Sequence, residues 1–249
     1  PTACAVVVAA GSLSAQNVPP ATSRDATALV QQVRAALGLD RAGPIDSLLL
    51  TGQSELLTGP QFSGEFELRL VLPDRYLTVN RFNGVDDAVG MRLDANRFSH
   101  IGAPGQSLAA KEVTDAVNAY HLAHLRREST LLAFALLLTD RTAVPVTFAY
   151  AGRARAPDGE AETLELVWGE KLSVRLFVDA TTKLPLLMTF EEMEIARRVL
   201  PPSSFKEFKP SMPTWEKVEQ KLFLGDYRRV KGVLFPHSIT LENAGPRSS

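Results

Sequence analysis

Two histidines stand three positions apart in the stretch His121-Leu122-Ala123-His124. On a helix this spacing places both imidazole rings on one face, as a pair of metal ligands would require. Glu128 is a candidate third ligand. No acidic residue stands where the helix of a hydrolytic metalloenzyme would carry its general base, which favours two polar helix residues beside Tyr120. A metal-dependent hydrolase is the less favoured alternative.

Carboxylates gather at Glu191, Glu192 and Glu194, and paired carboxylates could perform acid–base chemistry. On a strand, however, Glu192 and Glu194 share one face and Glu191 lies on the other, which predicts a solvated strand end. The chain has no Gly-x-Ser-x-Gly nucleophile motif, and the glycines of residues 102–107 lack the lysine of a phosphate-binding loop. The sequence therefore predicts a protein that is not an enzyme, with no catalytic residue, metal or cofactor.

Two segments have the spacing of helices. Ser23 can cap a helix that ends before Gly38, with an apolar stripe formed by Ala26, Leu29, Val30, Val33 and Leu37. Residues 107–139 are amphipathic at first and become apolar on nearly all sides from Glu128 onward. A helix that is apolar all round is normally surrounded by protein. Both helices must therefore lie on apolar surfaces of the same molecule.

Much of the remaining chain alternates between polar and apolar residues with period two, as half-buried strands do. Extended segments are expected at residues 45–57, 64–73, 75–82, 145–152, 162–168, 172–179, 184–194, 215–224 and 233–242. About ten antiparallel strands cannot stay flat, because a sheet of that size twists and curls. The prediction is an α+β fold in which a curved antiparallel sheet forms an unclosed β-barrel that wraps the helices. Residues 17–249 are expected to form a single domain.

The concave side of such a sheet would carry more apolar surface than two helices can cover. In the hairpin after Asp179, for example, Leu186, Met188 and Phe190 would face this hollow. The residues expected to line it and to bind lipid are Phe66, Leu68, Leu70, Tyr76, Phe82, Trp168, Phe177, Met188, Phe190 and Phe223. Burying a methylene group contributes about 0.8 kcal/mol, so an acyl chain of about twelve carbons offers roughly 10 kcal/mol before entropic costs.

The first residues predict export from the cytoplasm. Residues 1–16 contain an apolar run from Ala3 to Ala10 followed by small and polar residues, as in a partial signal peptide that is cleaved. An N-terminal core strand is the alternative. Cys4 is the single cysteine, so the cleaved chain would have no thiol, which suits the periplasm.

Three stretches resemble the LolA/LolB-like superfamily of periplasmic lipoprotein carriers and lipid-binding proteins. Residues 64–76 form a strand, a proline turn and an aromatic-bearing return strand; residues 179–185 read D-x-x-T-x-L-P, and residues 226–236 read D-Y-x-x-V-x-G-x-x-x-P. The resemblance implies an unclosed barrel over helices, and a lipid or an acylated lipoprotein as partner. The dedicated carrier has an arginine immediately before the proline of the first stretch, where this chain has Leu72. That departure puts strict lipoprotein transfer in doubt.

The sequence thus predicts a periplasmic carrier that holds lipid or lipoprotein acyl chains in an apolar half-barrel, with envelope membrane proteins as further candidate partners. The net charge of −1 gives no electrostatic reason to expect a nucleic-acid partner. An envelope protein-interaction module with a packed core is the alternative, in which Phe205 and Phe208 of a proline-rich loop would contact the partner.

Overall fold

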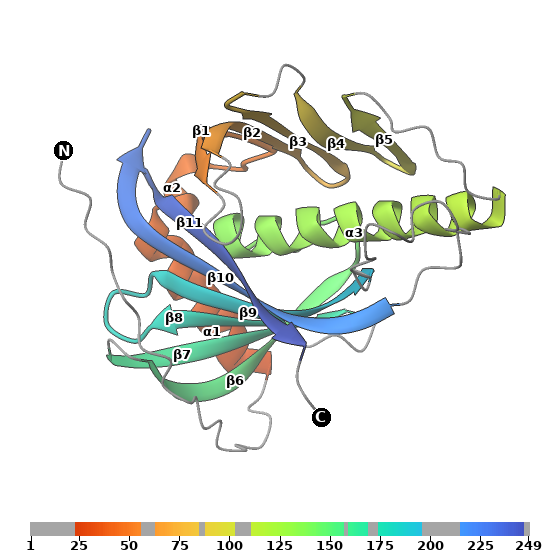
Figure 1. The fold of residues 1–249 in the computed structure, drawn as a ribbon. Coiled ribbons are helices and arrows are strands. Elements are labelled where there is room, and N and C mark those ends of the chain that lie inside the picture. The colour runs from red at the N-terminus through yellow and green to blue at the C-terminus, as the bar shows by residue number, and fades with distance from the viewer. Residues whose placement is uncertain are drawn as a thin grey trace.

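The computed structural model describes residues 23–55, 63–84, 88–102, 111–156, 159–168, 174–195 and 215–246. Within these ranges the chain forms three helices and two antiparallel sheets, of five and six strands (Figure 1). The prediction of one curved sheet is therefore corrected to two sheets, and among the described strands neither sheet closes on itself. The predicted signal in residues 1–16 and the patch around Phe205 and Phe208 lie outside the described residues.

The five-stranded sheet is a meander in which each strand pairs with the next along the chain. Its strands are β1 (Ser47–Glu55), β2 (Ser63–Val71), β3 (Arg75–Phe82), β4 (Val89–Asp94) and β5 (Arg97–Ile101). The register pairs Leu70 with Tyr76, and both side chains are buried on the inner face. The sequence predicted β1 to β3 but not the hairpin of β4 and β5, whose side chains are mostly exposed, with Leu93 the buried one.

The six-stranded sheet has the order β11-β10-β9-β8-β7-β6. Its strands are β6 (Val146–Ala156), β7 (Gly159–Trp168), β8 (Val174–Asp179), β9 (Pro185–Ile195), β10 (Trp215–Val230) and β11 (Val233–Pro246). The register aligns Leu164, Leu176, Met188 and Leu222 in one row across four strands. All four side chains are buried, so this row marks the inner face of the sheet.

The hairpin between β8 and β9 confirms the predicted turn at residues 179–183. The Asp179 carboxylate accepts hydrogen bonds from the backbone N–H groups of Thr181 and Thr182 and from the Thr182 hydroxyl group. These donors, the Thr182 N–H first, hold the pKa of Asp179 below its ordinary value. β9 then begins at Pro185, because the first position of a strand tolerates a missing donor.

Helix α1 (Ser23–Leu37) packs on β6 and touches β11, with the predicted stripe facing inward. Gly38 follows with a φ of +80°, and a Cβ atom there would lie 2.7 Å from the carbonyl oxygen of Gly232. The close approach and the left-handed backbone both favour glycine at this end of the helix. The short helix α2 (Leu39–Ala42) comes directly afterwards.

Helix α3 (Lys111–Leu137) lies between the two sheets (Figure 1). It contacts β3, β4 and β5 of the five-stranded sheet, and Phe134 stacks on Phe148 of β6 with ring centroids 5.3 Å apart. Every residue from Leu131 to Leu138 is buried, as the apolar sequence predicted. A single cluster of buried apolar side chains includes members of both sheets, α1 and α3. None of the described helices has the length and apolar character needed to cross a membrane.

Candidate functional site

The residues predicted to line a hollow are divided between the inner and the outer faces of the two sheets. Leu68, Leu70, Tyr76, Met188 and Phe190 are buried members of the core cluster. Phe66 is half-buried and packs against that cluster, and Phe82 is half-buried on the same face of β3 as Tyr76. These residues are the part of the predicted set that the fold directs to the inner side of the sheets.

Phe177 and Phe223 lie on the outer face of the six-stranded sheet, because strand side chains alternate between faces. Both pair with Leu187, which is one position away from the inward-facing Met188. Their side chains therefore lie on the opposite face of the six-stranded sheet from Met188. Trp168 ends β7, where its backbone pairs with Val146.

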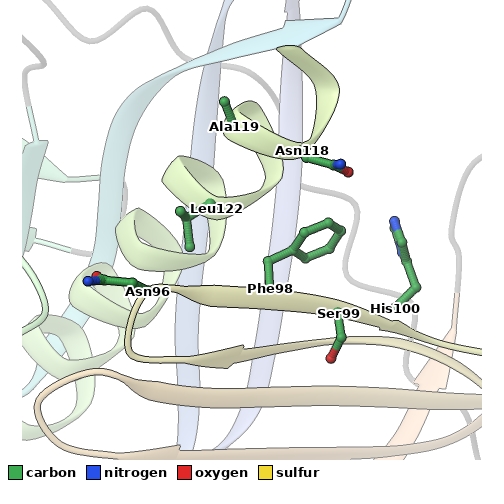
Figure 2. Close-up of a pocket in the computed structure, with 7 residues that line it drawn as sticks. All are labelled: Asn96, Phe98, Ser99, His100, Asn118, Ala119 and Leu122. Atoms are coloured by element: carbon green, nitrogen blue, oxygen red, sulfur yellow. The ribbon is translucent and has the colours of Figure 1, made fainter. Parts of the chain in front are cut away.

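An open groove of about 410 Å³ lies between β5 and the first half of α3. Its lining residues are Asn96, Phe98, Ser99, His100, Asn118, Ala119 and Leu122 (Figure 2). Phe98 points from the strand toward the helix and Leu122 points from the helix toward the strand, whereas Ser99 points away from the helix (Figure 2). The volume falls within the range of small-molecule sites, roughly 300–1,000 Å³.

The apolar part of this groove is continuous with the protein core. Phe98 and Leu122 are both half-buried and pack against the core cluster. The groove therefore combines an apolar floor with amide and imidazole groups at its edges.

A series of aromatic rings leads from the groove toward the interior. Phe98 stacks on His121 with ring centroids 5.1 Å apart, and His100 meets His121 edge-on at 5.3 Å. His121 contacts Tyr120 at 5.4 Å, and Tyr120 stacks on His124 at 5.7 Å. His121 and His124 are therefore parts of a ring contact network rather than isolated polar residues of a helix face.

His124 is held between two carboxylates. Its Nδ1 atom lies 2.5 Å from Glu192 Oε1 on β9, and its Nε2 atom lies 3.6 Å from Glu128 Oε2 on α3. The Tyr76 hydroxyl group on β3 donates a hydrogen bond of 2.9 Å to Glu128 Oε1. These contacts form one polar chain that joins the five-stranded sheet, α3 and the six-stranded sheet.

The prediction of a solvated strand end is wrong for Glu192. This residue is 8% exposed, because its even-numbered position on β9 shares the inward face with Met188 and Phe190. Its neighbour Glu191 lies on the other face and pairs with Lys217. Glu191 and Glu192 lie on opposite faces of β9 as predicted, but which face is covered depends on the position of α3.

Burial and neighbouring charges shift the pKa values of the side chains in this polar chain. Burial lowers the pKa of His124. The hydrogen bond and charge of Glu192 and the charge of Glu128 raise this pKa by more than burial lowers it, so the net shift is upward. Burial raises the pKa of Glu128, against the opposing effects of His124 and Tyr76. Burial and the neighbouring Glu128 raise the pKa of Tyr76. The two acidic neighbours thus stabilise the protonated form of His124 relative to a free histidine.

The geometry does not support His121 and His124 as a metal pair. Both ring nitrogens of His124 face carboxylates, and the His121 ring stacks on Phe98. In the described part of the chain, no three His, Cys, Asp or Glu side chains come together so that they could hold a metal ion. The pKa of His121 is lowered by burial and by the neighbouring His100 and His124, so this ring is favoured in its neutral form.

No protein-family profile and no curated protein matches the chain. The fold is similar to a crystal structure from Vibrio parahaemolyticus described as a putative outer membrane lipoprotein-sorting protein domain, with a TM-score of 0.45, 10% identity and coverage of 90% of this chain and 87% of that one. A LolA superfamily protein from Nitrosomonas europaea gives a TM-score of 0.45 at 10% identity, covering 88% and 86% of the two chains. A DUF1329 family protein from Desulfovibrio piger gives 0.36 at 11% identity, covering 88% and 86%.

Proposed function

We propose that this protein is a periplasmic carrier that binds lipid or the acyl chains of a lipoprotein, and that the acyl chain lies in the groove between β5 and α3. In this proposal the two sheets form a half-barrel around α1 and α3. The observation that carries it is the open groove of about 410 Å³, whose apolar floor of Phe98 and Leu122 packs on the core.

The energetics of burial support an acyl ligand. Each methylene group removed from water contributes about 0.8 kcal/mol, so several methylenes against Phe98 and Leu122 offset part of the entropic cost of association. Behind the groove, the same apolar surface is continued by the inward-facing side chains of Leu68, Leu70, Tyr76, Met188 and Phe190. A longer chain would reach them by displacing the part of α3 from Val117 to His124, where none of the described side chains is buried, whereas every side chain from Leu131 to Leu137 is.

The side chains around the groove favour binding over catalysis. The edges carry the amides of Asn96 and Asn118 and the His100 imidazole, whereas the Ser99 side chain points away from the helix. Ser99 and His100 are consecutive on a strand and therefore point to opposite faces, so they cannot form a nucleophile and base pair. His124, the histidine with a raised pKa, already has a carboxylate at each ring nitrogen.

Blocking the groove tests the proposal. Ala119 lines the groove and is exposed on α3, so Ala119→Trp fills the space without disturbing the core. Ala28→Trp on the exposed side of α1 is the matched control. We expect Ala119→Trp to weaken the binding of a fluorescent fatty acid by about tenfold or more, because a few lost methylene contacts amount to about 1.4 kcal/mol or more.

The measurement is a fluorescence titration combined with native mass spectrometry of the gently purified protein. The control variant should bind as the wild type does. Absence of bound lipid together with no uptake of the fluorescent fatty acid would contradict the proposed function. Equal binding by wild type and Ala119→Trp would place the ligand outside the groove.

A further inference from the structure

Arg126 adjoins one end of the groove, where it contacts the lining residue Asn96. It follows Leu122 by one helical turn of α3, and residues four apart lie on the same side of a helix. One guanidinium N–H group of Arg126 donates a hydrogen bond to the side-chain oxygen of Asn96, which lines the groove. Figure 2 shows Asn96 at one end of the lining residues and His100 at the other.

The positive charge of Arg126 lacks a counter-ion among the described residues. Its Nε atom is buried and has no hydrogen-bond partner there. Asp94, close to Asn96 in the chain, pairs instead with Arg92 at 3.6 Å. By contrast Arg127, the next residue, lies 4.0 Å from Glu192. The terminal N–H groups of Arg126, in contrast, are exposed beside Asn96, so a guanidinium without a carboxylate partner would stabilise an anion there.

The groove extends away from this charge along apolar side chains. From Asn96 to His100 the strand spans about 13 Å at roughly 3.3 Å per residue. From Asn118 to Arg126 the helix spans about 12 Å at roughly 1.5 Å per residue. Phe98 and Leu122 lie between these limits. Asp115, one turn before Asn118, disfavours a second anion at the far end.

We propose that Arg126 and Asn96 bind the anionic head group of a single-chain amphiphile, whose acyl chain runs along Phe98 and Leu122 toward His100. This inference rests on the proposed function and names its ligand class: an acyl chain that ends in a carboxylate or a phosphate. The Arg126 guanidinium donates charge-assisted hydrogen bonds to the head group, while Asn96 holds the guanidinium in place.

The test compares head groups on the same chain. Palmitate and palmitoyl lysophosphatidic acid, each below its micelle concentration, are titrated against the purified wild-type protein alongside monopalmitoylglycerol, which is neutral. We expect the anionic ligands to bind roughly 10- to 100-fold more tightly than the neutral one, the range of a charge-assisted hydrogen bond. Whether palmitate or lysophosphatidic acid is preferred identifies a carboxylate or a phosphate as the natural head group.

Variants assign the preference to one side chain. Arg126→Gln should abolish the preference for anionic ligands while leaving the neutral ligand's affinity unchanged, and Arg126→Lys should retain much of it. Arg153→Gln, which removes an exposed cation from β6, is the charge-matched control. It should change neither the preference for anionic ligands nor the affinity for the neutral ligand. Asn96→Asp keeps Arg126 but supplies it with a carboxylate, so this variant should also lose the preference even if Arg126→Gln folds poorly.

Four outcomes are decisive. Equal affinity of the wild type for anionic and neutral ligands would overturn the role of Arg126, and so would a preference that survives in both Arg126→Gln and Asn96→Asp. Absence of binding for all three amphiphiles would instead overturn the proposed function. Loss of the preference in both variants with retained neutral binding supports the inference.

Discussion

The two halves of α3 are fixed by different physical means. Every side chain from Leu131 to Leu137, at the end of the helix, is at most 9% exposed and packs into one apolar cluster with strands of both sheets. Between Asn118 and Glu128, in contrast, Leu125 is the one buried apolar side chain, and ring stacking and the polar chain through His124 supply other contacts. The groove lies beside this polar half.

This difference in packing between the two halves of α3 indicates where the fold can accommodate a ligand. Apolar side chains in a close-packed core leave almost no cavities, and creating a cavity among them costs several kcal/mol of folding free energy. Directional contacts between a few side chains leave room beside them, because they satisfy one another without filling the surrounding volume. We therefore expect the second half of α3 to determine stability and the first half to determine binding.

The largest effect should come from the apolar half. Phe134 is fully buried and stacks on Phe148. Phe134→Ala removes a ring from a packed core and should lower the free energy of unfolding by about 3–5 kcal/mol. Urea titration followed by circular dichroism measures this change. Val167→Ala, at a position that is 47% exposed, is the control and should stay within about 0.5 kcal/mol of wild type.

A smaller effect is expected from the polar chain, and two adjacent residues test it. Glu192→Gln removes the negative charge that faces His124 Nδ1 and Arg127 and should lower the free energy of unfolding by about 1–3 kcal/mol. Glu191→Gln removes the same charge from the opposite face, where the pair with Lys217 is partly exposed, and should cost less than about 1 kcal/mol. Equal effects of the two substitutions would contradict the assignment of Glu192 to the interior.

The smallest effect is the dependence of stability on pH. The folded-state pKa of His124 is raised above 6.5, so its contribution is fully present below that pH and is lost as the pH rises through the folded pKa. The raised pKa of Glu128 acts in the same direction, since its ionised form is disfavoured in the folded state. The stability advantage of wild type over His124→Gln should therefore shrink as the pH rises above 6.5.

His121 must be separated from this effect. Its folded pKa is lowered, so protonation of His121 destabilises the fold and gives the opposite pH dependence, at lower pH. The comparison is therefore repeated in a His121→Gln background by urea titration at several pH values. A stability difference between wild type and His124→Gln that stays constant with pH would contradict the charged state of His124.

The sequence predicted the elements that have strong periodicity. The apolar stripe of α1, the buried second half of α3 and the alternation in β2 and β3 are all present. These features follow from local patterns, because burial of one helix stripe or strand face is encoded in consecutive residues. The hairpin of β4 and β5 escaped prediction since its exposed edge strand carries little apolar alternation.

The site was less predictable than the fold. The pair of His124 and Glu192 joins residues 68 positions apart, and their contact exists because α3 covers the inner face of β9. The faces of Phe177 and Phe223 depend on strand register, where a difference of one position reverses the direction of a side chain. The groove includes β5, which the sequence pattern did not indicate.

The most direct test is photo-crosslinking with a palmitate analogue that carries a diazirine on its chain, followed by peptide mapping. If the groove holds the acyl chain, the adducts should fall on Phe98, His100 and the segment from Asn118 to Leu122, and excess palmitate should suppress them. Adducts concentrated elsewhere, such as on the exposed Ile239 and Leu241 of β11, or adducts that palmitate cannot suppress, would contradict it.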